Sequence, residues 1–172
     1  DAITRGQAAK FITGMLNLNV EDIDNPNFTD VPTTHMFYKE IAALKKADIV
    51  TGYDDTTYRP DDTITRNEMA IILTRAFNLQ TTVETVPFTD VSNYMLPFVA
   101  AIYSEGITEG VNATTFAGDE TVSRAQAATF MYRAEGSAAK PVVLQAPIEG
   151  IADNSVKIGD TLYDVGAYAQ IL

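Results

Sequence analysis

The chain has 172 residues, no cysteine and a formal net charge of −11 at pH 7. The lack of cysteine excludes disulfide and thiol chemistry, and the negative charge argues against nucleic-acid binding, which depends on clustered Lys and Arg side chains. No apolar run reaches the roughly 18 residues that a membrane span needs, so we expect no membrane insertion. With 46% hydrophobic residues the chain can form one globular domain and an appendage.

The first element expected along the chain is a helix near residues 5–17. The segment 4–7 (Thr-Arg-Gly-Gln) has the form of a capping box, in which a hydroxyl caps the helix and a Gln or Glu three residues later reaches back. Apolar residues follow at helical spacing. They include Phe11 and Ile12, which we expect to be buried, while Asn19 and Glu21 beyond the helix should be exposed.

The same box occurs twice more, as Thr-Arg-Asn-Glu at 65–68 and Ser-Arg-Ala-Gln at 123–126. Each is again followed by apolar residues at helical spacing, which predicts equivalent helices near 66–78 and 124–135. The residues expected to be buried in these helices are Ile72, Leu73, Phe130 and Met131.

A second recurring segment, Phe-Thr-Asp-Val, stands at 28–31 and again at 88–91. Each copy precedes a periodic stretch, around 38–44 and 96–102, that predicts a further helix. Phe28 and Phe88 should be buried, and the favoured role of Asp30 and Asp90 is to cap these helices. Each stretch ends in a glycine, Gly52 or Gly110, where the backbone must take a positive φ.

The composition changes after residue 136. Residues 137–141 have the character of a linker, and the following apolar residues, punctuated by Gly and Asp, favour short strands. About 30 residues are too few for an independent domain. We therefore predict that 137–172 is a linker and the start of a β-rich domain.

Together these motifs resemble the S-layer homology family. Its pattern of Phe-x-Asp-Val, a helix, Gly-Tyr-x-Asp and Ile-Thr-Arg-x-Glu is matched closely by residues 28–79 and more loosely by 88–135. The resemblance implies a mainly α fold: the C-terminal half of a first module at 1–24, and whole modules at 25–83 and 84–136. It also implies that these tandem helix-turn-helix modules pack as a pseudo-threefold prism. Because the first module lacks its front helix, we expect the chain to be a mature or trimmed fragment.

The resemblance also implies a function. Such modules anchor secreted S-layer proteins to the bacterial cell wall, without catalysis, by binding secondary cell-wall polysaccharides that carry pyruvate ketals. Other copies of the S-layer protein are expected as partners. The alternative is a module for S-layer self-assembly or other protein-protein contact, in which the motif arginines are structural.

Three arginines, Arg5, Arg66 and Arg124, stand at the first helical position of the boxes. There the guanidinium and the free N–H groups of the helix start form a candidate site for a carboxylate. The alternative is that each arginine pairs with an acidic residue of the neighbouring module. The resemblance favours the ligand role, and it implies intermodule positions for Arg66 and Arg124, with Arg5 weaker because its module is incomplete.

Other candidates for contact with the polysaccharide are Gly52 and Gly110, through their N–H groups, and Tyr53, by stacking on a sugar or by half-buried packing. Direct sugar contact is the alternative role for Asp30 and Asp90. The sole histidine, His35, is interpreted as a loop or capping residue. The family commonly has His-Trp at this place, and this chain has no Trp, so we expect no indole in its ligand grooves.

Four aspartates at positions 54, 55, 61 and 62 crowd one loop and suggest calcium. Their spacing does not match the EF-hand pattern, so exposed turns, with Asp55 among the solvated residues, are the favoured interpretation. No cofactor or metal is predicted.

Overall fold

The computed structural model describes residues 1–21, 23–81, 83–137, 150–152, 155–158 and 161–164. The chain divides into two compact units, Asp1–Ala139 and Lys140–Leu172, and each is considered by itself. Most of the predicted linker at 137–141 lies outside the described residues.

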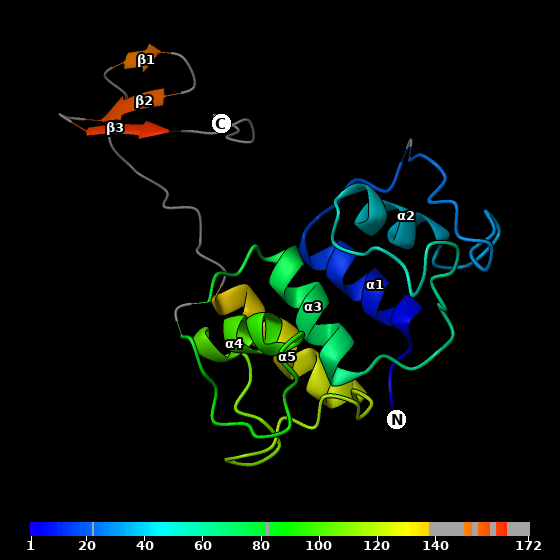
Figure 1. Cartoon of the computed structure of the whole chain (residues 1–172). Coiled ribbons are helices and arrows are strands. Elements are labelled where there is room, and N and C mark those ends of the chain that lie inside the picture. The colour runs from blue at the N-terminus through cyan, green and yellow to red at the C-terminus, as the bar shows by residue number, and fades with distance from the viewer. Residues whose placement is uncertain (22, 82, 138–149, 153–154, 159–160, 165–172) are drawn as a thin grey trace. The chain divides into compact units, whose positions relative to one another are not determined.

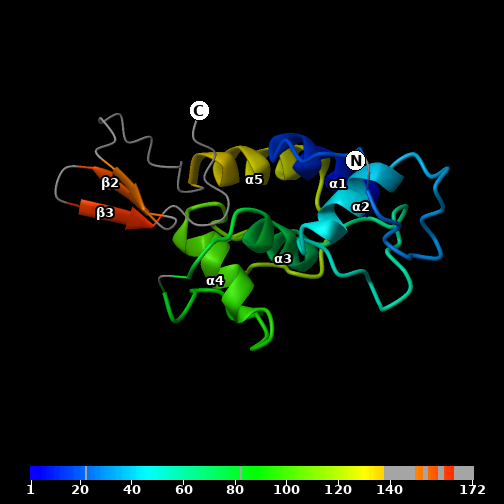
Figure 2. The same ribbon diagram turned by 90° about the horizontal axis from the view of Figure 1, so that it is seen from above.

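The first unit is helical, as predicted (Figure 1). Helix α1 packs against α2 and α5, and α3 packs against α4; Figure 2 shows the same pairs from a second direction. Both the three helices that follow the boxes and the two that follow Phe-Thr-Asp-Val are therefore confirmed. Their bounds are α1 Arg5–Met15, α2 Tyr38–Lys46, α3 Arg66–Ala76, α4 Leu96–Ser104 and α5 Arg124–Ser137.

The three capping boxes form in full. In the first, the Gln7 amide donates to Thr4 Oγ1 at 3.2 Å, and the Thr4 amide donates to Gln7 Oε1 at 3.0 Å. The boxes that begin at Thr65 and Ser123 make the same reciprocal bonds. Each box satisfies two backbone donors that the helix itself leaves free, so the helix starts are fixed by local sequence.

The residues just before the boxes join the three helix starts. The Ile3 amide donates to the Val122 carbonyl at 3.0 Å, the Val122 amide to the Ile64 carbonyl at 2.9 Å, and the Ile64 amide to the Ile3 carbonyl at 3.1 Å. These bonds close a ring. All three side chains are buried, so the ring lies inside the core and ties together segments far apart in the sequence.

The predicted core is largely confirmed. Phe28 and Phe88 are buried, and so are Ile12, Ile72, Leu73, Phe130 and Met131. The predicted exposed residues, Asn19, Glu21 and Asp55, are exposed.

The prediction for Phe11 is wrong, because this side chain is 39% exposed. The buried face of α1 runs through Arg5, Ala8 and Ile12, and Phe11 lies on its flank. There its ring meets the Arg124 guanidinium, whose carbon is 5.7 Å from the ring centre.

The two turn glycines have the positive φ that the sequence predicts, 109° at Gly52 and 80° at Gly110. A Cβ at Gly52 would lie 2.7 Å from the Phe28 ring and 2.5 Å from the Asp54 carbonyl oxygen. A Cβ at Gly110 would lie 2.5 Å from the Phe88 ring. Both glycines are thus required by close approach as well as by backbone conformation.

The second unit contains strands β1 Gly150–Ala152, β2 Ser155–Ile158 and β3 Thr161–Asp164. Within the described residues they form an antiparallel sheet in the order β1-β2-β3, with Val156 opposite both Ile151 and Tyr163. The predicted short strands are confirmed. Across the described part of the chain, no helix has the length and apolar character to cross a membrane.

Candidate functional site

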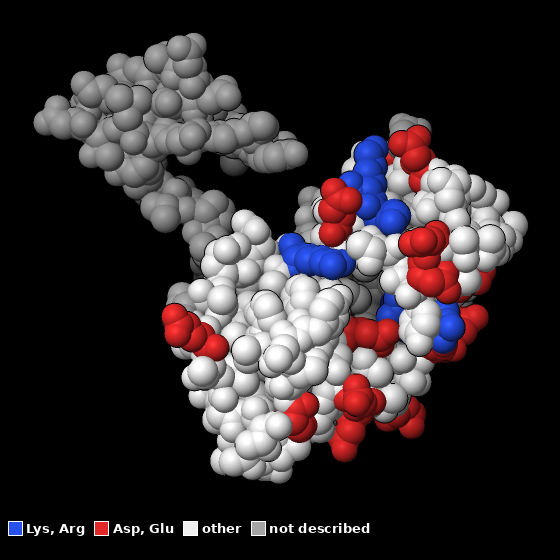
Figure 3. Space-filling model, viewed as in Figure 1, with Lys and Arg blue, Asp and Glu red and all other residues white. Residues whose placement is uncertain are grey.

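Two equivalent grooves lie where the arginine of one box meets the glycine turn and box helix of the next repeat. They have volumes of about 290 and 450 Å³. On the face drawn in Figure 3 the surface is hollowed between α3 and the α1–α2 side, with basic and acidic side chains around the hollow. Groove 1 is lined by Arg5, Ile49, Val50, Thr51, Gly52, Tyr53, Glu68, Ile71, Ile72, Arg75 and Tyr94. Groove 2 is lined by Arg66, Thr108, Glu109, Gly110, Val111, Ala125, Gln126, Thr129, Phe130 and Arg133.

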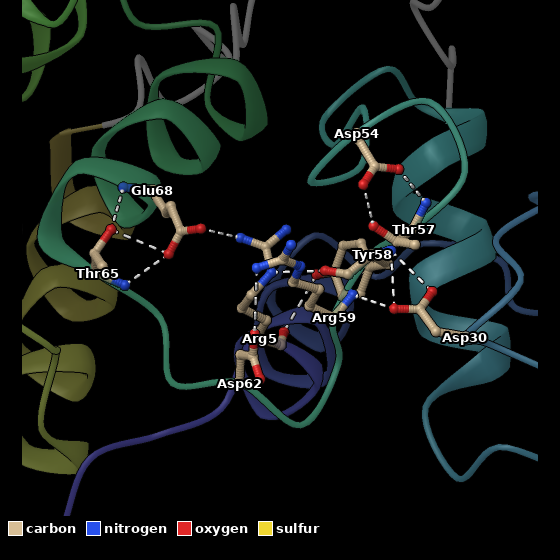
Figure 4. A network of polar contacts seen from close by, with 9 residues as sticks. All are labelled: Arg5, Asp30, Asp54, Thr57, Tyr58, Arg59, Asp62, Thr65 and Glu68. Carbon is tan, nitrogen blue, oxygen red and sulfur yellow. Dashed lines mark hydrogen bonds and ion pairs between the residues drawn. The ribbon is translucent and has the colours of Figure 1, made fainter.

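The guanidinium of Arg5 in groove 1 is held by partners within the protein (Figure 4). Its Nε donates to the Tyr58 carbonyl at 2.8 Å, and its Nη1 forms an ion pair with Glu68 Oε1. The guanidinium carbon lies 4.8 Å from the centre of the Tyr58 ring. The side chains of Arg5 and Glu68 are 7% and 24% exposed, so the arginine of this ion pair is shielded from water and the carboxylate is partly solvated.

Glu68 has two roles. Its Oε2 accepts from the Thr65 amide at 2.8 Å and from the Thr65 hydroxyl at 3.0 Å, which completes the capping box of α3. Its other oxygen neutralises Arg5. One carboxylate therefore caps a helix and balances a charge on a neighbouring repeat.

Arg66 takes the equivalent place in groove 2. Its Nε donates to the Phe116 carbonyl at 2.7 Å, and its guanidinium carbon lies 4.8 Å from the Phe116 ring and 5.2 Å from the Phe130 ring. The residue is 3% exposed. Its Nη2 is buried and meets no hydrogen-bond acceptor within the described residues. An unsatisfied buried donor costs about 1–3 kcal/mol, and more when it is charged.

The electrostatic surroundings of Arg66 agree with this geometry. Burial lowers the pKa of the Arg66 guanidinium, while Glu120 and Asp90 raise it, and the pKa falls below its ordinary value. The alternative in which every motif arginine pairs with an acidic residue thus fits Arg5, whereas no ion pair to Arg66 is found in the described residues.

Gln126 of the following box lines groove 2 together with Arg66, at the motif position that Glu68 has in groove 1. Gln126 Oε1 accepts from the Ser123 amide at 2.8 Å to complete its capping box. The remaining polar group of this side chain is an amide NH₂, which donates and cannot accept. Groove 2 therefore has a donor where groove 1 has a carboxylate oxygen.

Asp30 and Asp90 do not cap helices, so that prediction is wrong. Asp30 accepts from the Tyr58 and Arg59 amides, at 2.9 and 2.6 Å. Asp90 accepts from the Phe116 and Ala117 amides, at 2.8 and 2.7 Å. The reason is that Arg59 and Ala117 both have positive φ, in a turn that directs two successive amides at one carboxylate. Neither aspartate lines a groove.

The Asp90 carboxylate is nevertheless close to the candidate site. Burial raises the pKa of Asp90, but the amides of Phe116, Ala117 and Asp90 itself, together with Arg66, outweigh burial and lower it. Asp90 thus holds the segment whose carbonyl accepts from Arg66, and it contributes negative charge nearby.

The starts of α1 and α3 do not offer free N–H groups in their first two helical residues, which corrects the predicted anion site at Arg5 and Arg66. The Arg5 and Gly6 amides donate to the carbonyls of Asp62 and Pro60, at 2.9 and 2.8 Å. In α3 the equivalent amides of Arg66 and Asn67 donate to the carbonyls of Glu120 and Gly118. Because the loop of the next repeat accepts from these amides, Arg5 and Arg66 can meet a ligand through their side chains only.

The three arginines differ in their position relative to the two grooves, and their expected order as ligand residues remains a prediction. Arg5 lies in groove 1, whereas Arg124 is exposed and lines neither groove. The reason is that each groove needs the glycine turn of the following repeat, and within the described residues no such turn follows α5.

The remaining candidates have mixed positions. Tyr53 lines groove 1 and is 55% exposed, with the Arg59 guanidinium carbon 3.4 Å from its ring centre. Tyr53 is therefore not half-buried packing.

The Gly110 amide donates to Thr108 Oγ1 at 3.2 Å, so this amide is engaged within its own turn. His35 Nδ1 accepts from the Phe37 amide at 3.2 Å, which confirms its role in the loop before α2.

The aspartate-rich loop is a hydrogen-bonded turn at Asp54. Its carboxylate accepts from the hydroxyls and amides of Thr56 and Thr57. These bonds, that from the Thr57 side chain first, lower the pKa of Asp54 to about 2. In the described residues no three His, Cys, Asp or Glu side chains are placed to hold a metal ion. The absence of a cofactor remains a prediction.

Sequence reasoning missed several groove residues, including Tyr94, Arg75 and the pair Glu68 and Gln126. The sequence places Glu68 and Gln126 at the last position of their capping boxes. Because capping already accounts for a Glu or Gln there, the motif does not by itself indicate a place in a groove. The signal available was the difference in charge between them at one motif position.

Comparison with known proteins finds the S-layer homology domain at residues 27–70 and 87–128, half of the chain. An endoglucanase of Bacillus sp. (strain KSM-635) is 33% identical over 107 residues, 62% of this chain and 11% of the relative. Exoglucanase XynX of Acetivibrio thermocellus is 32% identical over 138 residues, 76% and 12% of the two chains. An S-layer protein of Bacillus licheniformis is 31% identical over 156 residues, which are 88% of this chain and 18% of the relative. The chain spans less than a fifth of the length of these relatives.

Proposed function

Because this chain belongs to the S-layer homology domain family, we propose that it binds a pyruvylated secondary cell-wall polysaccharide in the grooves between its repeats. Membership places the chain among secreted, cell-surface modules that associate with the cell wall and serve in S-layers. Such a domain anchors and does not catalyse. Where relatives are glucanases, we place any catalysis outside the residues that match the family.

The single observation that carries the proposal is the buried Nη2 of Arg66. It is a buried charged donor on a residue that lines groove 2, and the described residues give it no acceptor. A carboxylate from a pyruvate ketal supplies an anionic acceptor of matching geometry, and charge-assisted hydrogen bonds of this kind are about twice as strong as neutral ones. Binding would thus remove the unfavourable desolvation that the free protein carries at this position.

Two further features support sugar binding around this contact. In groove 1 the exposed ring of Tyr53 is suited to stack on the apolar face of a sugar. The turns that line the grooves require glycine, since a Cβ at Gly52 or Gly110 would clash with atoms of its own turn. We assign no cofactor to this function.

We also propose that the three repeats surround a pseudo-threefold axis as a prism. The ring of hydrogen bonds among Ile3, Ile64 and Val122 supports this arrangement, because each box start donates to one neighbour and accepts from the other. Such an axis would make grooves 1 and 2 equivalent by rotation.

The test is binding of the purified protein to peptidoglycan-linked polysaccharide, with and without its pyruvate groups. Arg66→Ala should weaken binding to the pyruvylated polymer by about 1.5–3 kcal/mol, the range of hydrogen bonds to charged groups. With polymer stripped of pyruvate, wild type and variant should bind alike. Arg124→Ala is the matched control, since Arg124 holds the same box position and lines neither groove. Unchanged binding of Arg66→Ala to pyruvylated polymer would overturn the proposal.

A second candidate function is a self-assembly module that binds other copies of the S-layer protein. It is favoured by the ion pair between Arg5 and Glu68, in which a motif arginine holds two repeats together. In that case Arg66→Ala should lower the melting temperature and change binding to both polymers equally.

A further inference from the structure

We infer that groove 1 continues into a second subsite, which binds an uncharged sugar of the polymer through the side chains of Tyr53, Arg59 and Asp62. The identity of the polymer rests on the proposed function. The subsite goes beyond that function, because it assigns binding to Arg59 and Asp62, outside the capping boxes, and to a sugar without a carboxylate.

A hollow of about 280 Å³ adjoins groove 1 at the segment that precedes α3. Tyr53 and the ion pair of Arg5 with Glu68 line both spaces, so the hollow and the groove share part of their walls. Arg59 and Asp62 line the hollow and not the groove, and Figure 4 draws them with that ion pair. A ligand longer than one sugar can therefore extend from groove 1 into the hollow along the Tyr53 ring.

The charges of the hollow favour an uncharged ligand with many hydroxyl groups. Two guanidinium groups and two carboxylates line it, and Arg5 and Glu68 are already paired with each other. A charged ligand would be attracted by one member of the remaining pair, Arg59 and Asp62, and repelled by the other. A sugar hydroxyl both donates and accepts, so it can satisfy the two side chains together.

The distance between Arg59 and Asp62 suits a bridging hydroxyl. Arg59 Nη1 lies 4.0 Å from Asp62 Oδ2, which is too long for a direct hydrogen bond. A hydroxyl group between them can accept from Arg59 and donate to Asp62, as bridging waters do between polar groups. The two side chains are 44% and 62% exposed, so a ligand can reach them and their direct attraction contributes little to stability.

Tyr53 holds the Arg59 guanidinium in place for this contact. The guanidinium carbon lies 3.4 Å from the centre of the Tyr53 ring, in the stacked arrangement that arginine adopts on an aromatic face. Stacking uses the flat face of the guanidinium and leaves the N–H groups at its edge available as donors. The backbone of Arg59 is fixed as well, because its amide donates to Asp30 at 2.6 Å.

Groove 2 lacks this subsite. Val111 stands at the position of Tyr53, and Ala117 stands at the position of Arg59. The equivalent turn thus has neither the ring nor the cation, although its backbone has the same positive φ, 57° at Ala117 and 59° at Arg59. Because alanine already occupies this conformation in one turn, Arg59→Ala should fold.

The test is titration calorimetry with the polymer stripped of its pyruvate groups. Arg59→Ala and Tyr53→Val give this turn the residues of the equivalent turn in groove 2. Each should weaken binding roughly 3- to 10-fold, the equivalent of one net hydrogen bond. Equal affinity of wild type and both variants for the stripped polymer, or no binding of this polymer by wild type, would overturn the inference.

Lys39→Ala is the matched control. It breaks another exposed ion pair, in which Lys39 Nζ lies 2.7 Å from Glu21 Oε1, and Lys39 lines neither the grooves nor the hollow. Its affinity for the stripped polymer should equal that of wild type. An equal loss in Lys39→Ala and Arg59→Ala would mean that surface charge in general, and not the subsite, governs binding.

The pyruvylated polymer separates this inference from the proposed function. Arg59 and Arg66 line different spaces, so the factors by which Arg59→Ala and Arg66→Ala weaken binding should multiply in the double variant. If Arg66→Ala has no effect on this polymer while Arg59→Ala weakens binding of the stripped polymer, the proposed carboxylate contact is wrong and the uncharged subsite stands. If Arg59→Ala weakens binding of the pyruvylated polymer only, Arg59 meets an anion, so the inference is wrong and the proposed function stands.

Discussion

Grooves 1 and 2 share a backbone but present different chemistry. In both, a buried arginine donates to the carbonyl of a buried aromatic residue, Tyr58 or Phe116, and lies 4.8 Å from its ring. They differ in the partner of the guanidinium: Arg5 pairs with the Glu68 carboxylate, whereas Arg66 has no ion pair within the described residues. A repeated fold can thus keep its architecture while the polar groups around an equivalent arginine differ.

The walls of the two grooves also differ in their aromatic residues. Groove 1 has the exposed rings of Tyr53 and Tyr94, whereas Val111 occupies the place of Tyr53 in groove 2. A groove with a neutralised arginine and aromatic walls suits the uncharged faces of sugars. A groove with an open buried arginine suits an anion.

The largest expected effect tests what the grooves share. Tyr58→Ala and Phe116→Ala should each lower the free energy of unfolding by about 3–5 kcal/mol, because each removes a fully buried ring against which an arginine packs. Urea denaturation measures both. Tyr58→Phe is the control and should lose about 0.5–1.5 kcal/mol, since it removes only the hydrogen bond from the Tyr58 hydroxyl to the Arg5 carbonyl. A large difference between the two alanine variants would show that the repeats are not structurally equivalent.

The next effect tests how the grooves differ. Arg5→Met should destabilise the protein by about 1.5–3 kcal/mol, because it leaves Glu68 without its charged partner. Arg66→Met should change stability by less than about 1 kcal/mol, since loss of the bond to the Phe116 carbonyl is offset by removal of an unsatisfied buried donor. Thermal unfolding without ligand decides this. Equal losses would mean that Arg66 has a partner equivalent to Glu68.

Removal of a capping hydroxyl should lower the stability of the protein by a smaller amount, similar in the two repeats. Thr65→Ala should cost about 0.5–2 kcal/mol by removing the acceptor for the Glu68 amide, and Ser123→Ala should cost a similar amount. The relevant measurement is the melting temperature, followed by polymer binding below it. Weakened binding with an unchanged melting temperature would indicate that the hydroxyl itself contacts the ligand.

The smallest effect concerns pH and the turn after Gly52. The folded pKa of Asp54, about 2, lies below its ordinary value of 3.8, so its ionised form stabilises the turn above the ordinary value. That contribution should fade as the pH falls from about 4 to about 2. In the equivalent turn of the following repeat, Asn112 stands at the position of Asp54. Its side chain accepts from the Thr114 amide and does not titrate. Asp54→Asn should therefore keep the turn and remove the pH dependence, as followed by NMR of the Thr57 amide.

The sequence alone determined the local parts of this molecule. The capping boxes place the starts of α1, α3 and α5, because each box forms from residues three apart. The turn glycines follow from backbone conformation, and the cores of the helices follow from helical spacing, with Phe11 as the exception on the flank of α1. The resemblance to the S-layer homology family also came from these short motifs.

Only the tertiary structure decided which residues meet across repeats. Arg5 and Glu68 stand 63 positions apart in the chain, and no local pattern states that they pair. For the same reason Asp30 and Asp90 were assigned to nearby helices, although they bind amides 26–29 residues away. The groove to which each arginine belongs likewise depends on how one repeat packs on the next. Local hydrogen bonds are fixed by spacing, whereas the partner of a buried charge is fixed by which distant segment the packed core brings beside it.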